Sequence, residues 1–298
     1  MSDVKKVVLV TGASSGIGRA AAGLLAAKGF KVYACARRLE AMADLAGLGV
    51  TPLELDITDE HLCRAVVDEI LYREGRIDAL VNNAGYGANG ALEDVPDEEA
   101  RHQFDVNVFG LMYLTRLVLP HMRGQGSGRI VNISSIGGKL VMPMAGWYHA
   151  SKFALEALSD ALRLEVEPFG LDVVVIEPGG VLSEFADIAK ENLLGISGAG
   201  PYAGQARLMA QALENVAKPG HGSITPATPL VIARVIAKAL ESPRPKTRYA
   251  APCHAKVFLF LRWLLPDRLF DKMLRGQMRG LAKEKTKCRC SLKCCGQR

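Results

Sequence analysis

The chain has 298 residues, of which 49% are hydrophobic and 23% charged, a globular composition that excludes disorder over the whole length and a collagen-like or coiled-coil rod. The formal net charge of +6 is a C-terminal property, because residues 255–298 alone carry +9, and no nucleic-acid groove is expected on the main body. No apolar run approaches the ~18 residues of a membrane-spanning helix and no signal-peptide pattern opens the chain, so we expect a cytoplasmic protein with reduced cysteines.

Apolar runs and helical patterns alternate through the first 180 residues. Most of the runs are rich in β-branched residues and flanked by Gly, Asp or Asn, which is typical of buried parallel strands. The predicted strands are residues 7–10, 31–36, 52–55, 79–81, 129–133 and 172–176, and the predicted helices are residues 17–28, 60–72, 100–122 and 148–167. This alternation predicts an α/β fold with a doubly wound parallel sheet of the Rossmann type, in one catalytic domain over residues 1–254.

After Pro178 the pattern changes. Residues 195–222 are rich in Gly and small residues around one helical stretch, 206–216, and we expect a mobile substrate loop over about residues 184–225. Residues 226–240 form a predicted helix with Leu230, Val231 and Val235 on its apolar side. Residues 255–282 form a basic, amphipathic helical extension around Pro266, and residues 283–298 form a basic, Cys-rich tail that we predict to be disordered.

A glycine-rich turn follows the first predicted strand and opens the first helix. Residues 11–18 read Thr-Gly-Ala-Ser-Ser-Gly-Ile-Gly. Glycine allows a tight turn, a close approach of backbone to phosphate and close packing of helix on strand, and the helix N-terminus favours an anion. The pattern predicts a pyrophosphate site made by Gly12, Ser14, Ser15, Gly16, Ile17 and Gly18. A glycine-rich turn without a ligand is the alternative for this motif taken alone.

Other polar residues recur at the ends of later elements. Asn83, Ala84 and Gly85 follow the fourth strand, Asn107 lies in a helix, Ser135 follows the fifth strand, and Tyr148 precedes Lys152 by four residues. Alone, each has an ordinary explanation as a turn, a local hydrogen-bonding residue or a solvated pair. In this order, together with the turn above and Pro178-Gly179, they resemble the short-chain dehydrogenase/reductase family. The resemblance covers residues 4–184 by motif and extends to about residue 250 by layout.

The pair Tyr148 and Lys152 shares one helix face. A free tyrosine has a pKa near ~10, and a neighbouring ammonium favours the phenolate and lowers that pKa. The family resemblance implies that Tyr148 is the general acid/base and that Lys152 lowers its pKa and binds ribose. It also implies that Ser135 holds the substrate oxygen and that Asn107 binds a water in a proton relay.

The end of the second strand indicates which nicotinamide cofactor is used. NAD-specific relatives usually place an acid there, whereas this chain has Ala36 followed by Arg37 and Arg38, whose guanidinium groups suit a 2′-phosphate. NADP(H) is therefore favoured, and NAD(H) stays open because Ser15 stands where some NADP-binding relatives carry a basic residue. Asp56 resembles the acid that contacts adenine.

The segment after the sixth strand completes the expected site. By resemblance, Pro178, Gly179, the Val181 backbone and the Ser183 hydroxyl hold the nicotinamide carboxamide. The candidate pocket walls, each of which has packing under the loop as its alternative, are Tyr86, Met142, Met144, Trp147 and Phe185. These mostly apolar walls suit an apolar carbonyl or alcohol.

The resulting prediction is an NADP(H)-dependent oxidoreductase that interconverts a carbonyl and a secondary alcohol on a lipid-like or steroid-like substrate. The alternatives are an NAD-linked alcohol dehydrogenase and a nonenzymatic dinucleotide-sensing or scaffold protein on the same fold. No metal site is expected, because the cysteines of the tail have poor zinc spacing; the tail is an extension without a specific role or a site of acylation.

The C-terminal segment has two interpretations, which differ in what it contacts. Val257, Phe258, Leu261, Leu264 and Leu265 near basic residues predict contact with a membrane surface. The family resemblance implies instead that the segment covers the substrate pocket or packs on another subunit in a homo-oligomer, and the two interpretations are compatible.

Overall fold

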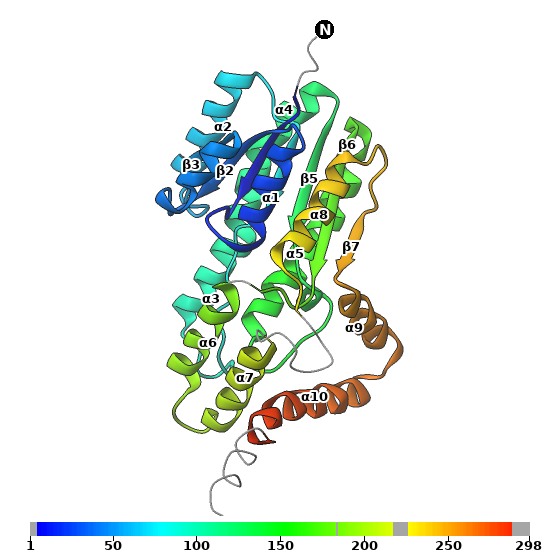
Figure 1. The fold of residues 1–298 in the computed structure, drawn as a ribbon. Coiled ribbons are helices and arrows are strands. Elements are labelled where there is room, and N and C mark those ends of the chain that lie inside the picture. Colours follow the sequence, from blue (N-terminus) through cyan, green and yellow to red (C-terminus); the bar gives the residue numbers. More distant parts are fainter. Residues whose placement is uncertain (1–4, 183, 217–225, 288–298) are drawn as a thin grey trace, which may run out of the picture.

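The computed structural model describes residues 5–182, 184–216 and 226–287. One parallel sheet of seven strands, in the order β3-β2-β1-β4-β5-β6-β7, runs through the molecule (Figure 1). The strands are β1 (Val7–Thr11), β2 (Lys31–Ala36), β3 (Val50–Glu54), β4 (Ala79–Asn82), β5 (Gly128–Ile133), β6 (Leu171–Pro178) and β7 (Arg248–Ala251). The predicted doubly wound, Rossmann-type α/β fold is confirmed, and the strand order reverses between β1 and β4.

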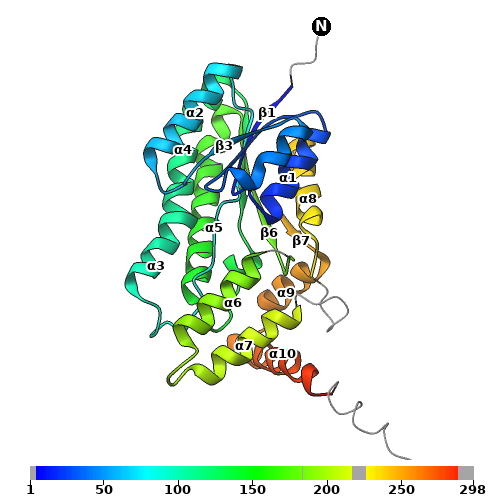
Figure 2. The same ribbon diagram turned by 60° about the vertical axis from the view of Figure 1, so that its left-hand side comes forward.

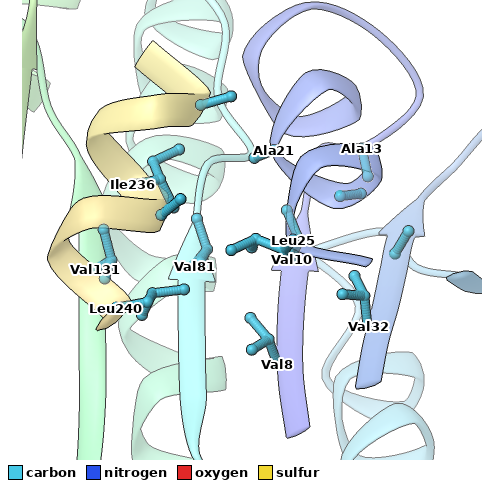
Figure 3. Packing of buried hydrophobic residues seen from close by; sticks show 14 of the residues in the cluster. Val8, Val10, Ala13, Ala21, Leu25, Val32, Val81, Val131, Ile236 and Leu240 are labelled. Carbon is cyan, nitrogen blue, oxygen red and sulfur yellow. The ribbon is translucent and has the colours of Figure 1, made fainter. Parts of the chain in front are cut away.

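Helices cover both faces of the sheet because both faces are apolar. Along β1, Val8 and Val10 point to one face and Val7 and Leu9 to the other, and all four are buried. The first face packs against α1 (Gly16–Ala27) and α8 (Pro229–Glu241), as Figure 3 shows for Leu25, Ile236 and Leu240. The second face packs against α2 (Glu60–Glu74), α4 (Leu111–Gln125) and α5 (Gly146–Val166).

Four helices lie beyond the carboxyl ends of the strands, and we call them the substrate lobe (Figures 1 and 2). They are α6 (Glu184–Ser197), α7 (Ala203–Val216), α9 (Cys253–Leu264) and α10 (Asp267–Lys287). Helix α7 packs against both α6 and α10. The segment expected to be a substrate loop is largely helical over 184–216, and α10 continues to Lys287, past the start of the predicted tail at residue 283.

Two predicted helices differ in detail from the structure. The helix expected over residues 100–122 is divided into α3 (Asp97–Phe104), a π-helical turn (Asp105–Gly110) and α4. At the turn, Gly110 lies so close to the Ile57 carbonyl group that a Cβ there would clash with it. Of the α8 residues predicted on the apolar side, Val231 and Val235 are half-buried and Leu230 is exposed. The buried residues of α8 are instead Ile232, Ala233, Ile236, Ala237, Ala239 and Leu240.

Two short elements were not predicted at all. A 3₁₀ helix, Glu40–Leu48, follows β2, and β7 pairs with β6 at the edge of the sheet. The four residues of β7, Arg-Tyr-Ala-Ala, lack a strand pattern of their own. In the part of the chain that the structure describes, no helix is long and apolar enough to cross a membrane.

Candidate active site

The turn between β1 and α1 forms a cradle of glycines. Gly12 and Gly16 have φ angles of +65° and +54°, in the left-handed region that favours glycine. A Cβ on Gly18 would lie 2.5 Å from Asn83 Nδ2 and closer still to the Gly12 carbonyl oxygen. Ser15, at the N-cap of α1, makes no capping hydrogen bond through its side chain, and no acid lies in the first turn. This helix N-terminus therefore suits the pyrophosphate of a dinucleotide.

The cradle is braced across the switch point between β1 and β4. The Asn83 amide donates to the carbonyl oxygens of Thr11 and Gly12, at 3.0 and 3.1 Å. The Thr11 hydroxyl accepts from the backbone N–H groups of Asn83 and Ala84, each at 3.0 Å. Next along the chain, a Cβ on Gly85 would lie 2.9 Å from Asn107 Oδ1. The sequence motifs after β1 and β4 thus form one interlocked backbone surface.

The end of β2 presents guanidinium groups to the same cleft. Arg38 donates to the Ser14 hydroxyl at 3.3 Å and pairs with Glu184 at 3.0 Å. That ion pair holds the pKa of Glu184 below its usual value. Asp56, beyond β3, accepts from the backbone N–H and the hydroxyl of Thr58 at 2.9 and 2.7 Å. Although burial raises the pKa of Asp56, these hydrogen bonds outweigh it and the pKa is lowered.

Glu184 was missed as a site residue by sequence reasoning. It is the first residue of α6 and lies 146 positions from Arg38 in the chain, so no local motif links the two. Its carboxylate occupies one face of Arg38, the side chain predicted to bind a 2′-phosphate. A bound 2′-phosphate and Glu184 would therefore compete for the same guanidinium group.

Tyr148, Lys152 and Ser135 converge as predicted. Tyr148 and Lys152 project from one face of α5, with Lys152 Nζ 5.9 Å from the centre of the tyrosine ring. The Lys152 ammonium donates to the Ile133 carbonyl oxygen at 2.9 Å. Ser135 caps a 3₁₀ turn, Ile136–Gly138, and its hydroxyl accepts from the Gly137 N–H at 3.0 Å.

The pKa values of this group correct one expectation. Burial raises the pKa of Tyr148 and outweighs its hydrogen bond with Ser135, which lowers it. The lowering by Lys152 that the sequence predicted is therefore not seen in this structure, in which the Lys152 ammonium donates to the Ile133 carbonyl oxygen. Burial lowers the pKa of Lys152 to about 8, against the opposing effect of the Glu156 carboxylate. The Lys152 ammonium is thus easier to deprotonate than an exposed lysine.

A buried group of charges lies behind Lys152. Glu156, one turn after Lys152 on α5, pairs with Lys139 at 3.2 Å and with Arg248 of β7 at 3.1 Å. Arg248 also lies 3.6 Å from Glu177 on β6. Burial, followed by repulsion from Glu156, raises the pKa of Glu177 to about 7. Arg248 of the short strand β7 thus supplies a positive charge to two buried acids, Glu156 and Glu177, beside α5.

Asn107 lies in the π-helical turn and is fully buried. Its amide nitrogen donates to the Tyr86 carbonyl oxygen at 2.9 Å and to the Ser151 hydroxyl at 3.0 Å, and its oxygen accepts from the Tyr86 N–H at 3.1 Å. Both amide hydrogens of Asn107 and one lone pair of its oxygen are thus bonded within the protein. The predicted binding of a water by Asn107 stays a prediction.

Two histidines that the sequence did not single out hold the loops of the site. His149 Nδ1 lies 3.0 Å from the Gly137 carbonyl oxygen, and its Nε2 accepts from the Met142 N–H at 3.0 Å, a pattern that requires the neutral Nδ1–H tautomer. His254 Nε2, from α9, accepts from the Gly180 N–H at 3.2 Å. Burial lowers the pKa of both histidines.

The glycine-rich turn, Ser135, Tyr148, Lys152 and His149 line one cleft of about 740 Å³, which runs from Arg37 and Arg38 to Met142. Asn107, His254 and the charges behind Lys152 are not among its lining residues. Of the predicted walls, Tyr86, Met142 and Phe185 line it, and the Phe185 ring lies 5.4 Å from that of Tyr148. Met144 and Trp147 are not among the lining residues. Met144 packs in an apolar cluster with α6 and α7, and the Trp147 ring packs edge-on against Phe104.

All but one of the predicted cofactor residues lie at or beside this cleft. Pro178, Gly179 and Val181 line it, and a parallel bridge between Val181 and Ala227 holds the segment in place. Ser183 lies outside the described residues. Of the residues in the glycine-rich turn, the cleft is lined by Gly12, Ser14, Ser15, Gly16 and Ile17, while Gly18 packs behind the turn.

Comparison with known proteins agrees with this geometry. Residues 6–193 match the family model of the short chain dehydrogenases, so the chain belongs to the short-chain dehydrogenase/reductase family and is an NAD(P)-dependent oxidoreductase. It is 34% identical over 296 residues to an NADPH-dependent 3-dehydrocapnine reductase of Ornithobacterium rhinotracheale, covering 94% of this chain and 99% of that one. It is 42% identical over 183 residues to a 3-ketodihydrosphingosine reductase of Bacteroides thetaiotaomicron, covering 61% of this chain and 66% of that one.

Solved structures show the same fold. A short-chain dehydrogenase/reductase from Burkholderia phymatum, solved in complex with NAD, matches with a TM-score of 0.75 and 27% identity. The match covers 89% of this chain and 95% of that one.

Proposed function

We propose that this protein is an NADP(H)-dependent reductase that interconverts a ketone and a secondary alcohol on an apolar, lipid-like substrate. The observation that carries the cofactor assignment is the end of β2, where Ala36 is followed by Arg37 and Arg38, and both arginines line the cleft. A guanidinium group binds a phosphate through charge-assisted hydrogen bonds and gains nothing comparable from a ribose hydroxyl. The NADPH dependence in the name of the 3-dehydrocapnine reductase supports the same choice.

The substrate assignment is supported by the other end of the cleft. Leu140, Met142, Phe185 and Leu213 line it around Tyr148, and apolar side chains of this kind bind apolar ligands. The two relatives above are named as reductases of 3-dehydrocapnine and of 3-ketodihydrosphingosine. We infer that a carbonyl oxygen would lie at Tyr148 and Ser135, with an apolar remainder against these walls.

The residues of the cleft fit a dinucleotide and divide the work of the reaction. The cradle of residues 12–18, with Asn83, Ala84 and Gly85 beside it, would hold the pyrophosphate end, and Pro178, Gly179 and Val181 would hold the nicotinamide end. A bound nicotinamide supplies or accepts the hydride. In reduction, the Tyr148 hydroxyl donates its proton to the carbonyl oxygen, which the Ser135 hydroxyl orients by a hydrogen bond. Lys152, with its pKa lowered to about 8 by burial, would help to return a proton to the Tyr148 oxygen after each turnover and would bind ribose.

The decisive experiment measures oxidation of NADPH and of NADH by the purified full chain with a panel of apolar ketones of increasing length. We expect NADPH to be used preferentially and the longer ketones to be the better substrates. Replacing Arg37 and Arg38 with Ala should weaken NADPH by about 1.5–3 kcal/mol for each charged hydrogen bond lost and leave NADH nearly unchanged. Equal loss of both cofactors, or loss of neither, would contradict the assignment.

A substitution at Glu184 tests the same assignment in the opposite direction. Glu184→Gln removes the competing carboxylate while keeping its shape, so we expect tighter NADPH and unchanged NADH. The alternative function, an NAD-linked alcohol dehydrogenase, is favoured by this same carboxylate beside Arg38 and by the NAD bound to the Burkholderia phymatum relative. It predicts the opposite result, in which Glu184→Gln weakens NADH.

A nonenzymatic binding protein on this fold would bind NADPH and show no turnover with any ketone or alcohol of the panel. Homo-oligomer formation stays a prediction from the family resemblance, and its test is the mass of the purified chain in solution. A membrane surface, the other predicted partner, involves different residues, those of α9 and α10.

A further inference from the structure

Helix α9 has large apolar side chains on two sides, and those of one side are partly buried against the body of the protein. Phe258, Leu261 and Leu265 pack with Leu140 and Phe270 in an apolar cluster. The other side carries large side chains in the open: Val257, Phe260, Trp263 and Leu264 are 55%, 55%, 78% and 54% exposed. Their spacing of three, three and one residues places them along one side of the helix. We call these four residues the outer face of α9.

This finding changes which residues could touch a membrane. The sequence predicted Val257, Phe258, Leu261, Leu264 and Leu265 as the apolar contact, but three of these five face inward. Phe260 and Trp263, which were not named in that prediction, take their place. An exposed tryptophan beside other large apolar side chains is typical of a helix that lies in a membrane interface.

The outer face lies one helix away from the substrate end of the cleft. The inner side chains of α9 pack in the same cluster as Ile136, Leu140 and Met142, and all three of these residues line the cleft. A surface that receives α9 would therefore lie beside the part of the cleft where the apolar substrate is proposed to bind.

Helix α10, which follows α9 in the chain, carries a row of cations. Its exposed cations, Arg268, Lys272, Arg275 and Arg279, are spaced four, three and four residues apart, so they form one stripe along the helix. On the opposite side Phe270 and Leu274 are buried against the body of the protein. We call the four cations the basic stripe of α10. Of the two acids in Asp267–Arg279, Asp267 is already paired with Arg262.

From these two surfaces we infer that the outer face of α9 and the basic stripe of α10 dock on an anionic lipid bilayer. The apolar side chains would enter the region between headgroups and acyl chains, and the cations would meet anionic headgroups. A second copy of this chain is the poorer occupant, because a symmetric dimer through the same surface would bring two basic stripes together. The biological role of this docking, the uptake of an apolar substrate from lipid, rests on the proposed function. The docking surface itself is inferred from the exposed side chains of α9 and α10 alone.

Trp263 makes the contact measurable without any assay of activity. The chain has two tryptophans, and Trp147 packs against Phe104, whereas Trp263 is 78% exposed. We would add vesicles of phosphatidylcholine with phosphatidylglycerol, and vesicles of phosphatidylcholine alone, to the full chain and record the emission spectrum. The expected result is a blue shift with the anionic vesicles that Trp263→Phe abolishes while the protein still sediments with them.

Variants then separate the two surfaces. Phe260→Glu with Trp263→Glu, and Arg268→Glu with Lys272→Glu, should each reduce sedimentation with anionic vesicles at least tenfold. Tyr72→Glu is the matched control, because Tyr72 is 89% exposed on α2, at the far end of the molecule from α10 (Figure 1). Raising the salt concentration should weaken binding of the parent and of the control alike, since the headgroup attraction is screened.

Three results would overturn the inference. The first is failure of the full chain to sediment with anionic vesicles at low salt, and the second is a loss of vesicle binding in Tyr72→Glu equal to that in the α9 and α10 variants. The third is a change from dimer to monomer in the α9 variant when the parent chain binds no vesicles. The last result would assign the face to a second copy of the chain. Reduction of a soluble short ketone should be unchanged in the α9 variant. Vesicle binding by a chain that reduces no ketone would leave the docking surface in place and overturn the proposed function alone.

Discussion

The two ends of the cleft are built in different ways. At the dinucleotide end, single residues determine the shape: Gly12 and Gly18 allow close backbone approach, and the Asn83 amide binds two carbonyl oxygens. At the substrate end, the lobe of α6, α7, α9 and α10 is held by apolar side chains such as Leu193, Met209 and Phe270, packed in two small clusters.

This difference separates specificity for the cofactor from specificity for the substrate. A backbone cradle tolerates few substitutions, because a Cβ or a lost amide changes the position of the main chain itself. An apolar cluster tolerates exchanges of similar volume, so the pocket can change shape while the fold is kept. The same chain can thus keep one cofactor site and adapt its substrate site.

The largest effect is expected where the two ends meet, at Tyr148. Tyr148→Phe removes just the hydroxyl group and with it the proton that the reaction exchanges, so turnover should fall by about 10²–10⁴-fold. NADPH binding and thermal stability should change little, because the ring contacts with Phe185 and His149 are kept. Steady-state rates and a cofactor titration on one preparation measure both. Undiminished reductase activity in this variant would sink the assignment of Tyr148 as the acid.

The second prediction concerns the substrate lobe and uses two neighbouring residues of α10. Phe270 is 2% exposed and Leu269 is 54% exposed. Phe270→Ala should lower the free energy of unfolding by about 3–5 kcal/mol, and Leu269→Ala should change it by no more than about 0.5 kcal/mol. Urea unfolding of both variants checks this. Equal losses of unfolding free energy in the two variants would show that α10 does not pack on the body as described. The substrate end of the cleft would then not be held by apolar packing.

The same difference explains what could be read from the sequence. The structure brings Gly12, Asn83, Ser135, Tyr148 and Lys152, all named from the sequence, to one cleft, because special residue types follow strands whose order places them at one edge of the sheet. The position of each of these residues relative to the strand before it is enough to place it at that edge. Helix α6 was predicted as a loop because Gly195 and Gly198 near its end mask its pattern. Its helical form depends on packing against α7.

The other differences between the sequence predictions and the structure also arise from tertiary contacts. The π-helical turn at Asn107 is set by the close approach of Gly110 to Ile57, a contact between residues 53 positions apart. Likewise, β7 exists through pairing of Tyr249 with Ile176, and Glu184 reaches Arg38 across the cleft. None of these contacts leaves a local pattern, so periodicity and motif spacing alone do not reveal them.

The third prediction tests the cradle within one helix, α1. Gly18→Ala places a Cβ against the Gly12 carbonyl group and should destabilise the fold by about 1–3 kcal/mol while weakening NADPH binding. Gly23→Ala is the matched control, because its Cβ would meet Leu48 at an ordinary 3.5 Å and a helix-favouring residue should stabilise the protein by about 0.5–1 kcal/mol. Thermal melts with and without NADPH measure both effects. Similar behaviour of the two variants would contradict a cradle that depends on Gly18.

The smallest effect is expected from His149, which links the catalytic helix to a wall of the substrate pocket. Burial lowers its pKa, so the folded protein holds it neutral while the unfolded chain takes up a proton below about pH 6.5. The unfolded state then binds more protons, and the contribution of His149 to stability is complete above that pH and falls as the pH decreases. Each unit of difference between the two pKa values is worth about 1.4 kcal/mol.

His149→Gln isolates this contribution, because an amide can still donate to the Gly137 carbonyl group and accept from the Met142 N–H but does not titrate. We expect the free energy of unfolding of the parent to fall relative to the variant between pH 6.5 and pH 5, and the difference to be constant above pH 7.5. Glu177 acts in the opposite direction, since its raised pKa of about 7 makes stability fall as the pH rises toward that value. That effect is common to both proteins and cancels in the difference. Parallel stability curves at every pH would mean that His149 is not held neutral, and the clamp on the loop between Gly137 and Met142 would then have to come from packing alone.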